Sequence, residues 1–387
     1  MPDARTREAA ELMTGFAERT GLTSKRPAQR YLWTDAFAVC NLLGLARATG
    51  DENYTALALA LIEAVHRTLG RHRPDHPGGW ISGLGDSEGE AHPTRGGLRI
   101  GKQLPERGPR EPYDDRLEWE RDGQYFHYLT KWMHALDQAS RATADPAFNL
   151  WARELAETAY GAFTYPDPAG GGARRMHWKM SIDLGRPLVA SMGQHDPLDG
   201  YVTFLQLKAS AARLPGPAAG PGLTGEIGGL AAMVQAGSLA TSDPLGIGGL
   251  LVDAYHLQQL IERGELADDG LLASLLSASL EGLDYFTASG ELLEPAERRL
   301  AFRELGLAIG LRAARSMLDE VSRDVNEPVA GDAPLEALAE YTILADRIES
   351  FWRKPAHQAT RLWREHRDIN EVMLATSLAP EGFLGIR

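Results

Sequence analysis

The sequence contains a single cysteine, Cys40, among 387 residues, and this scarcity excludes several kinds of site. One thiol cannot form an intramolecular disulfide, and it cannot supply the cysteine ligands of a structural zinc centre. Cys40 stands in an apolar run, so we expect it to be buried as a small hydrophobic side chain. The histidines and carboxylates show no spacing typical of a metal site, so we predict neither a metal nor a cofactor.

Long apolar runs and an excess of positive charge are also missing. No run approaches the roughly 18 apolar residues that a membrane span needs, and residues 1–20 are too charged for a secretory signal. The formal net charge of −13 disfavours nucleic acids and anionic membranes as partners. We therefore expect a cytoplasmic protein that binds a small molecule. The sequence does not determine its oligomeric state.

Helical periodicity occupies most of the chain, in two alternating types. One type has a single apolar face at a spacing of 3.6, with charges opposite, which is typical of a helix buried on one side. The ranges of this outer type are 51–70, 146–163, 268–287 and 334–349. The other type is apolar or small nearly all round, which indicates burial on most faces. The ranges of this inner type are 34–49, 246–261 and 300–314.

Glycines recur inside the inner type of helix. They are Gly44, Gly248, Gly249, Gly306 and Gly310. Each costs a helix about 1 kcal/mol relative to alanine, so we expect them where helices crowd together.

Two connections, 71–121 and 165–199, are much longer than the others. Unstructured loops of more than about 15 residues are uncommon inside compact domains and are usually functional. β-Alternation is weak, although 80–82 or 98–100 could form a short hairpin. Because no linker interrupts the pattern, we predict one domain over 1–387.

Every second helix is preceded or opened by residues suited to catalysis or binding. These segments are 31–35, 118–125, 194–200, 242–246 and, more weakly, 298–299. About twelve helices arranged as six hairpins in a ring would bring these starts to one mouth. We therefore predict an all-α fold, an (α/α)6 barrel, with the two long connections over the active-site mouth.

The helix number, the alternation and the segment Tyr-Leu-Trp-Thr-Asp-Ala-Phe at 31–37 resemble the six-hairpin glycosidase superfamily. They also resemble its neighbours, the N-acylglucosamine 2-epimerase-like proteins. The resemblance implies an (α/α)6 barrel with a carbohydrate pocket at the mouth. It includes no catalytic signature, so it does not identify the working carboxylate or histidine.

Carboxylates at the helix starts suggest glycoside hydrolysis, which needs one carboxylic acid and one carboxylate. We predict Asp122 and Asp199 as the acid/base pair, with Asp35 orienting water or substrate. Helix capping is the alternative explanation for any one of these aspartates.

Histidines offer a second mechanism, because imidazole can abstract a proton at neutral pH. In this alternative the protein is a sugar epimerase or lyase, with His195 and His177 as bases. A third alternative is a sugar-binding protein without catalysis.

Further side chains are expected to hold the substrate, a short saccharide. The predicted sugar-binding residues are Trp33, Gln124, His127, His177 and Trp178. Arg99 and Lys179 are predicted to hold an anionic group if the sugar carries one. Trp80 and Trp119 are expected near the same mouth. Four other tryptophans are expected in the core: Trp132, Trp151, Trp352 and Trp363.

Overall fold

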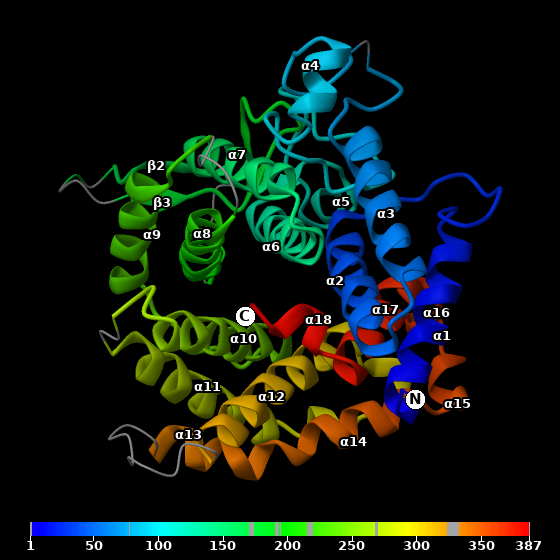
Figure 1. The fold of residues 1–387 in the computed structure, drawn as a ribbon, viewed down its shortest axis with the longest axis vertical. Helices are drawn as coiled ribbons and strands as arrows, with labels where there is room; N and C mark the ends of the chain where they lie inside the picture. The colour runs from blue at the N-terminus through cyan, green and yellow to red at the C-terminus, as the bar shows by residue number, and fades with distance from the viewer. Residues whose placement is uncertain are drawn as a thin grey trace. The chain divides into compact units, whose positions relative to one another are not determined.

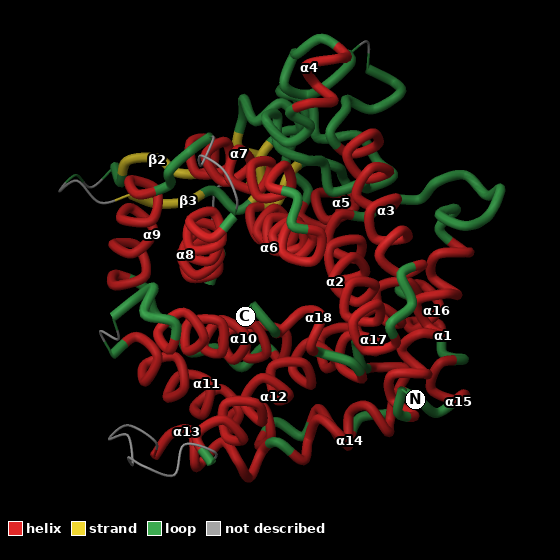
Figure 2. The backbone as a smooth tube through the Cα atoms, in the orientation of Figure 1, coloured by secondary structure: helices red, strands yellow, loops and turns green. Residues whose placement is uncertain are grey.

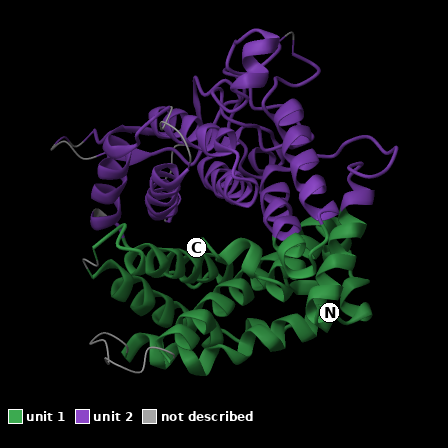
Figure 3. Ribbon diagram, in the orientation of Figure 1, with its two compact units in different colours: residues 1–16, 44–51, 238–387 green, residues 17–43, 52–237 purple. Residues whose placement is uncertain are grey.

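A computed structural model describes most of the chain and is dominated by helices (Figures 1 and 2). The described residues are 2–76, 78–168, 170, 174–189, 193, 195–214, 220–267, 270–322 and 333–386. The chain forms two compact units (Figure 3). Unit 1 comprises 1–16, 44–51 and 238–387, and unit 2 comprises 17–43 and 52–237.

Unit 2 is built around three long helices that contact one another. α6 (Phe126–Thr143) packs against α7 (Pro146–Phe163) and α8 (Asp196–Arg213), and α8 packs against α9 (Thr224–Ala236). Its other helices are α3 (Asn53–Leu69), α4 (Asp86–Ala91) and α5 (Asp115–Glu120). α1 (Ala4–Arg19) and α2 (Leu32–Thr49) each contribute residues to both units.

Unit 1 is organised by α10 (Pro244–Glu262) and α12 (Ala301–Val321), which pack closely together. α11 (Leu271–Ala288) covers α10, while α14 (Ile343–Trp352) and α17 (Arg367–Leu378) pack on α12. The shorter helices are α13 (Ala333–Leu338), α15 (Pro355–Gln358), α16 (Arg361–Glu365) and α18 (Glu381–Leu384). Among its described residues there are also three 3-10 turns: η1 (Glu291–Leu293), η2 (Ala296–Arg298) and η3 (Ala339–Tyr341).

Short strands in unit 2 pair residues of the second long connection, 165–199, with those that follow the first, 71–121. β1 (Gln124–Tyr125), β4 (Lys179–Met180) and β5 (Pro187–Val189) form an antiparallel sheet in the order β1-β4-β5. β2 (Thr164–Pro166) pairs with β3 (Arg174–Met176). The hairpins expected at 80–82 or 98–100 do not form; Trp80 makes only an isolated bridge to Arg71.

Burial follows the two predicted helix types. α3 buries one face, whereas α10 and α12 are buried on most sides. Cys40 is buried, as expected. Three of the tryptophans expected in the core are buried, but Trp151 is partly exposed and donates its Nε1–H to the Ala91 carbonyl. Within the described part of the chain, no helix is both long and apolar enough to cross a membrane.

Glycines allow α10 and α12 to approach each other at backbone distance. A Cβ atom added to Gly248 would lie 2.2 Å from the Gly306 carbonyl oxygen, and one added to Gly310 would lie 2.6 Å from the Gly248 Cα. The expectation for these three glycines is confirmed. Gly249 differs, because a Cβ atom there would meet nothing within 4 Å.

Gly248→Ala should therefore destabilise the protein by at least about 2 kcal/mol, because two backbones must separate to admit the methyl group. The adjacent Gly249→Ala is the matched control, and it should be neutral or stabilising by up to about 1 kcal/mol. Urea unfolding of both variants measures the difference. Equal stabilities would contradict the close approach of α10 and α12.

His66 is a buried histidine of α3 that accepts a hydrogen bond from Trp132. The Trp132 Nε1 lies 3.2 Å from the His66 Nε2. Burial lowers the pKa of His66 to about 3, so its imidazole stays neutral in the folded protein.

His66 should make the folded state acid-sensitive. The unfolded chain takes up this proton near pH 6.5 and the folded one only near pH 3. The stabilising contribution is therefore complete above pH 6.5 and is lost as pH falls between these values, at about 1.4 kcal/mol per pH unit. His66→Gln, measured by urea unfolding at pH 7 and 4.5, should show a smaller loss than the unmodified protein. An unchanged pH dependence would contradict the role given to His66.

Candidate functional site

Six side-chain rings from unit 2 form one cluster beside the first turns of α2 and α6. This aromatic cluster consists of Tyr31, Trp33, Tyr125, His127, Tyr128 and Trp178. Neighbouring ring centroids in it lie between 4.9 and 6.1 Å apart. Trp119, from the end of α5, packs edge-on against Trp178 with a centroid distance of 4.8 Å.

Local backbone structure explains why these rings meet. β1 pairs with β4, with Tyr125 opposite Lys179, and this brings the neighbouring Trp178 beside Tyr125. α6 begins directly after β1, so His127 and Tyr128 occupy its first turn. Thus the strand that follows the first long connection, 71–121, pairs with a strand of the second, 165–199.

His127 and Asp196 form a pair at the starts of α6 and α8. The His127 Nδ1 lies 3.6 Å from the Asp196 Oδ1, and the two side chains are 23% and 8% exposed. Both Nδ1 of His127 and Oδ2 of Asp196 are buried, and neither has a hydrogen-bond partner among the described residues. Buried polar atoms are nearly always satisfied by protein, water or ligand. The pair therefore retains hydrogen-bonding capacity beside the rings.

Tyrosine hydroxyls supply further hydrogen-bonding groups. The Tyr31 and Tyr128 hydroxyl oxygens lie 2.6 Å apart. Burial raises the pKa of Tyr31, Tyr125 and Tyr128 above the ordinary value of a phenol. All three therefore stay protonated at neutral pH and act as neutral hydrogen-bonding groups.

Asp122 is held in a fully buried cage of donors in unit 2. Its Oδ2 lies 2.5 Å from the Arg99 Nη1 and 3.4 Å from the Arg73 Nη1. Its Oδ1 accepts hydrogen bonds from the backbone N–H groups of Gly101 and Lys102. This environment gives Asp122 a structural role. Its predicted role as acid or base gains no support, because neither oxygen is exposed.

Asp199 and Asp35 are also engaged by neighbouring groups. Asp199 lies 2.6 Å from the Lys131 Nζ and accepts a hydrogen bond from Thr130. Asp35 pairs with Arg30 at 3.4 Å and accepts the backbone N–H of Tyr31 at 2.9 Å. Both aspartates thus brace the starts of the helices that carry the cluster, and their catalytic roles stay predictions.

Three residues predicted to hold the substrate instead make contacts within the protein: Lys179, Arg99 and Gln124. They anchor the two long connections to neighbouring parts of unit 2. The Lys179 Nζ is buried against the Glu118 carboxylate at 3.1 Å, and burial lowers its pKa while Glu118 opposes this. Arg99 also donates to the carbonyl of Arg71. The Gln124 amide donates to the carbonyls of Gly96 and Ile182 and accepts the Leu98 N–H. These side chains position the site and leave little capacity for a ligand.

His177 and His195 occupy different surroundings. His177 stacks on Tyr165 of the β2–β3 hairpin, with ring centroids 4.2 Å apart. Its stacking partner, Tyr165, is not a member of the aromatic cluster. His195 immediately precedes α8 and is half-buried there. Its neighbour Gln194 lies outside the described residues. Trp80, expected at the mouth, is instead buried beneath Arg71.

Several residues of the site were missed from the sequence. Tyr125 is the last residue of the candidate segment 118–125. Tyr128 follows inside a helical pattern, and no feature of the sequence distinguishes it as a site residue. Asp196 lies within the segment 194–200, but nothing in the sequence indicates its position beside His127. Lys102 lies with its Nζ 5.4 Å from the Tyr31 ring centroid.

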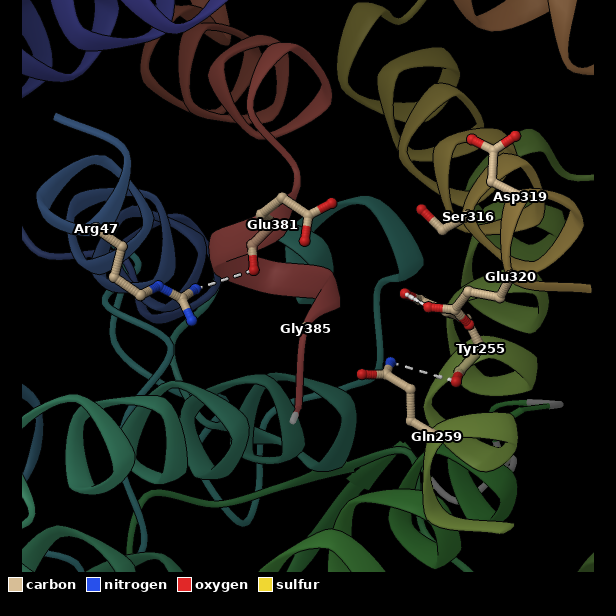
Figure 4. Close-up of a pocket in the computed structure, with 8 residues that line it drawn as sticks. All are labelled: Arg47, Tyr255, Gln259, Ser316, Asp319, Glu320, Glu381 and Gly385. Carbon is tan, nitrogen blue, oxygen red and sulfur yellow. Dashed lines mark hydrogen bonds between the residues drawn. The ribbon is translucent and has the colours of Figure 1, made fainter. Parts of the chain in front are cut away.

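A separate polar hollow of about 370 Å³ lies within unit 1 (Figure 4). Its lining is Arg47, Tyr255, Gln259, Ser316, Asp319, Glu320, Glu381 and Gly385. The carboxylate of Glu320 accepts a hydrogen bond from the Tyr255 hydroxyl, and Arg47 donates to the backbone carbonyl of Glu381. None of the predicted site residues lies here. The candidate site is therefore the aromatic cluster with His127 and Asp196.

No known family model matches the chain, and no curated protein shows significant similarity to it.

Proposed function

We propose that unit 2 binds a carbohydrate ring at the aromatic cluster, where His127, oriented by Asp196, transfers a proton to or from it. The observation that carries this proposal is the pair of buried, unsatisfied polar atoms on His127 and Asp196 beside the rings. Aromatic faces suit the C–H faces of sugars, and the tyrosine hydroxyls suit their hydroxyl groups.

The chemistry follows from the orientation of the imidazole. A carboxylate beside Nδ1 favours the tautomer that carries its proton there, and it stabilises the imidazolium formed later. The Nε2 atom is then left as the base. This favours an epimerase or lyase with His127 as the base, in place of the His195 and His177 first considered.

Glycoside hydrolysis is the second candidate. Asp196 and Glu120 have no arginine or lysine partner among the described residues, and Glu120 is exposed at the end of α5. Glu120 is close enough to the cluster to raise the pKa of Tyr31 and Tyr125. These two carboxylates, rather than Asp122 and Asp199, are the candidates for an acid/base pair.

The predicted (α/α)6 barrel is part of the same proposal. Within unit 2, α6 and α8 contact each other and carry α7 and α9; within unit 1, α10, α12 and α17 form a similar series. This alternation of inner and outer helices is what such a barrel requires. A crystal structure would test it directly.

Incubation in D₂O with a panel of hexoses, N-acetylhexosamines, sugar acids and disaccharides separates the candidates. Deuterium appearing on a ring carbon, followed by NMR, supports proton transfer by histidine. Release of new reducing ends supports hydrolysis. Binding without either reaction would show a sugar-binding protein, and no binding at all would reject the proposal.

A further inference from the structure

We propose that Lys102 makes the site selective for sugars that carry a carboxylate. This inference rests on the proposed function and names the substrate class. Lys102 follows Gly101, and both backbone N–H groups donate to the buried Asp122 carboxylate. The Lys102 carbonyl accepts a hydrogen bond from Arg73 at 2.9 Å. The backbone is thereby fixed, and the side chain reaches the Tyr31 ring of the aromatic cluster.

The ammonium group of Lys102 differs from the neighbouring cations. Arg99, Lys131 and Lys179 each form an ion pair with a carboxylate. Lys102 is half-buried, and across the described residues its Nζ has no hydrogen bond or ion pair. A partly desolvated ammonium without a partner is unfavourable, and a ligand carboxylate would satisfy it. Burial also lowers the pKa of Lys102, as the loss of hydration requires.

The surrounding charges favour a carboxylate over a phosphate. Glu120 is exposed and near enough to raise the pKa of Lys102, and Asp122 acts in the same direction. Asp122 is already neutralised by Arg99 and Arg73. Glu120 repels any anion that approaches Lys102, and this repulsion is smaller for the single charge of a carboxylate. It is larger for the charge of about −1.5 to −2 on a phosphate at neutral pH.

Binding of glucuronate, glucuronamide and glucose, followed by tryptophan fluorescence, tests the selectivity. We expect glucuronate to bind about tenfold tighter than the neutral sugars, as for one charge-assisted hydrogen bond. Lys102→Gln should abolish this preference, whereas Lys102→Arg should retain it. Glu120→Gln should strengthen glucuronate binding. A preference that survives in Lys102→Gln would overturn the proposal.

A second experiment tests the role of Lys102 independently of the proposed function. It follows the acetylation of Lys102 by peptide mass spectrometry. Glucuronate should slow the acetylation of Lys102 several-fold but not that of the exposed Lys25. If neutral sugars bind and carboxylates do not protect Lys102, the selectivity is wrong and the proposed function stands. If no sugar binds but lactate protects Lys102, the carbohydrate function fails and the anion site stands. No protection by either carboxylate would reject the role of Lys102.

Discussion

Replacing His127 with glutamine should reduce turnover by about 10²- to 10⁴-fold, because the variant loses the side chain that we propose as the base. Glutamine preserves hydrogen bonding to a sugar hydroxyl, so ligand affinity should change little. The D₂O exchange rate, measured beside binding by tryptophan fluorescence, separates these two effects.

His195→Gln and His177→Gln are the matched controls for this experiment. Both histidines are half-buried in unit 2, and His177 stacks on Tyr165 outside the aromatic cluster. Each should retain most of the turnover. If either control lost more activity than His127→Gln, the base would be reassigned to that histidine, as the sequence first suggested.

Asp122→Asn should destabilise the protein by about 3–5 kcal/mol, because the buried Arg99 would lose the carboxylate with which it forms its ion pair. Asp196→Asn should instead leave stability nearly unchanged and lower turnover. Its Oδ2 has no partner to lose among the described residues, so stability should change by less than about 1 kcal/mol. Its turnover should fall, because the imidazolium of His127 is no longer stabilised.

Urea unfolding and the exchange assay together measure this contrast. A stable but inactive Asp122→Asn protein would restore Asp122 as the acid or base of a hydrolase. A fully active Asp196→Asn protein would remove the His127–Asp196 pair from the mechanism.

Apolar periodicity was sufficient to predict the long helices and their two types of burial. A helix such as α3 buries one face against a neighbour, so its apolar residues recur with a period of 3.6 in the sequence. The strands of unit 2 contain only two or three residues, too few to show alternation. The pairing of β1 with β4 joins segments more than 50 residues apart, so it depends on tertiary structure.

The same distinction applies to the candidate site. Trp33 and His127 could be anticipated because each stands at a helix start, and the structure joins them by a ring contact. The partners of Asp122 could not be anticipated. Arg99 lies 23 residues away along an irregular connection, and residue type alone does not indicate which cation reaches a carboxylate.

The division of the chain between the two units has a consequence for the timing of folding during synthesis. Residues 17–43 and 52–237 can complete unit 2 while residues 238–387 are still unmade. The early segments of unit 1 need late partners: Arg5 pairs with Glu349, and Gly44 packs so closely on Gly382 that an added Cβ atom would lie 2.7 Å from its Cα. At translation rates of about 5–20 residues per second, the remaining 150 residues take roughly 8–30 s. During that interval the partners of residues 1–16 and 44–51 do not yet exist, so these segments of unit 1 depend on slow, long-range closure.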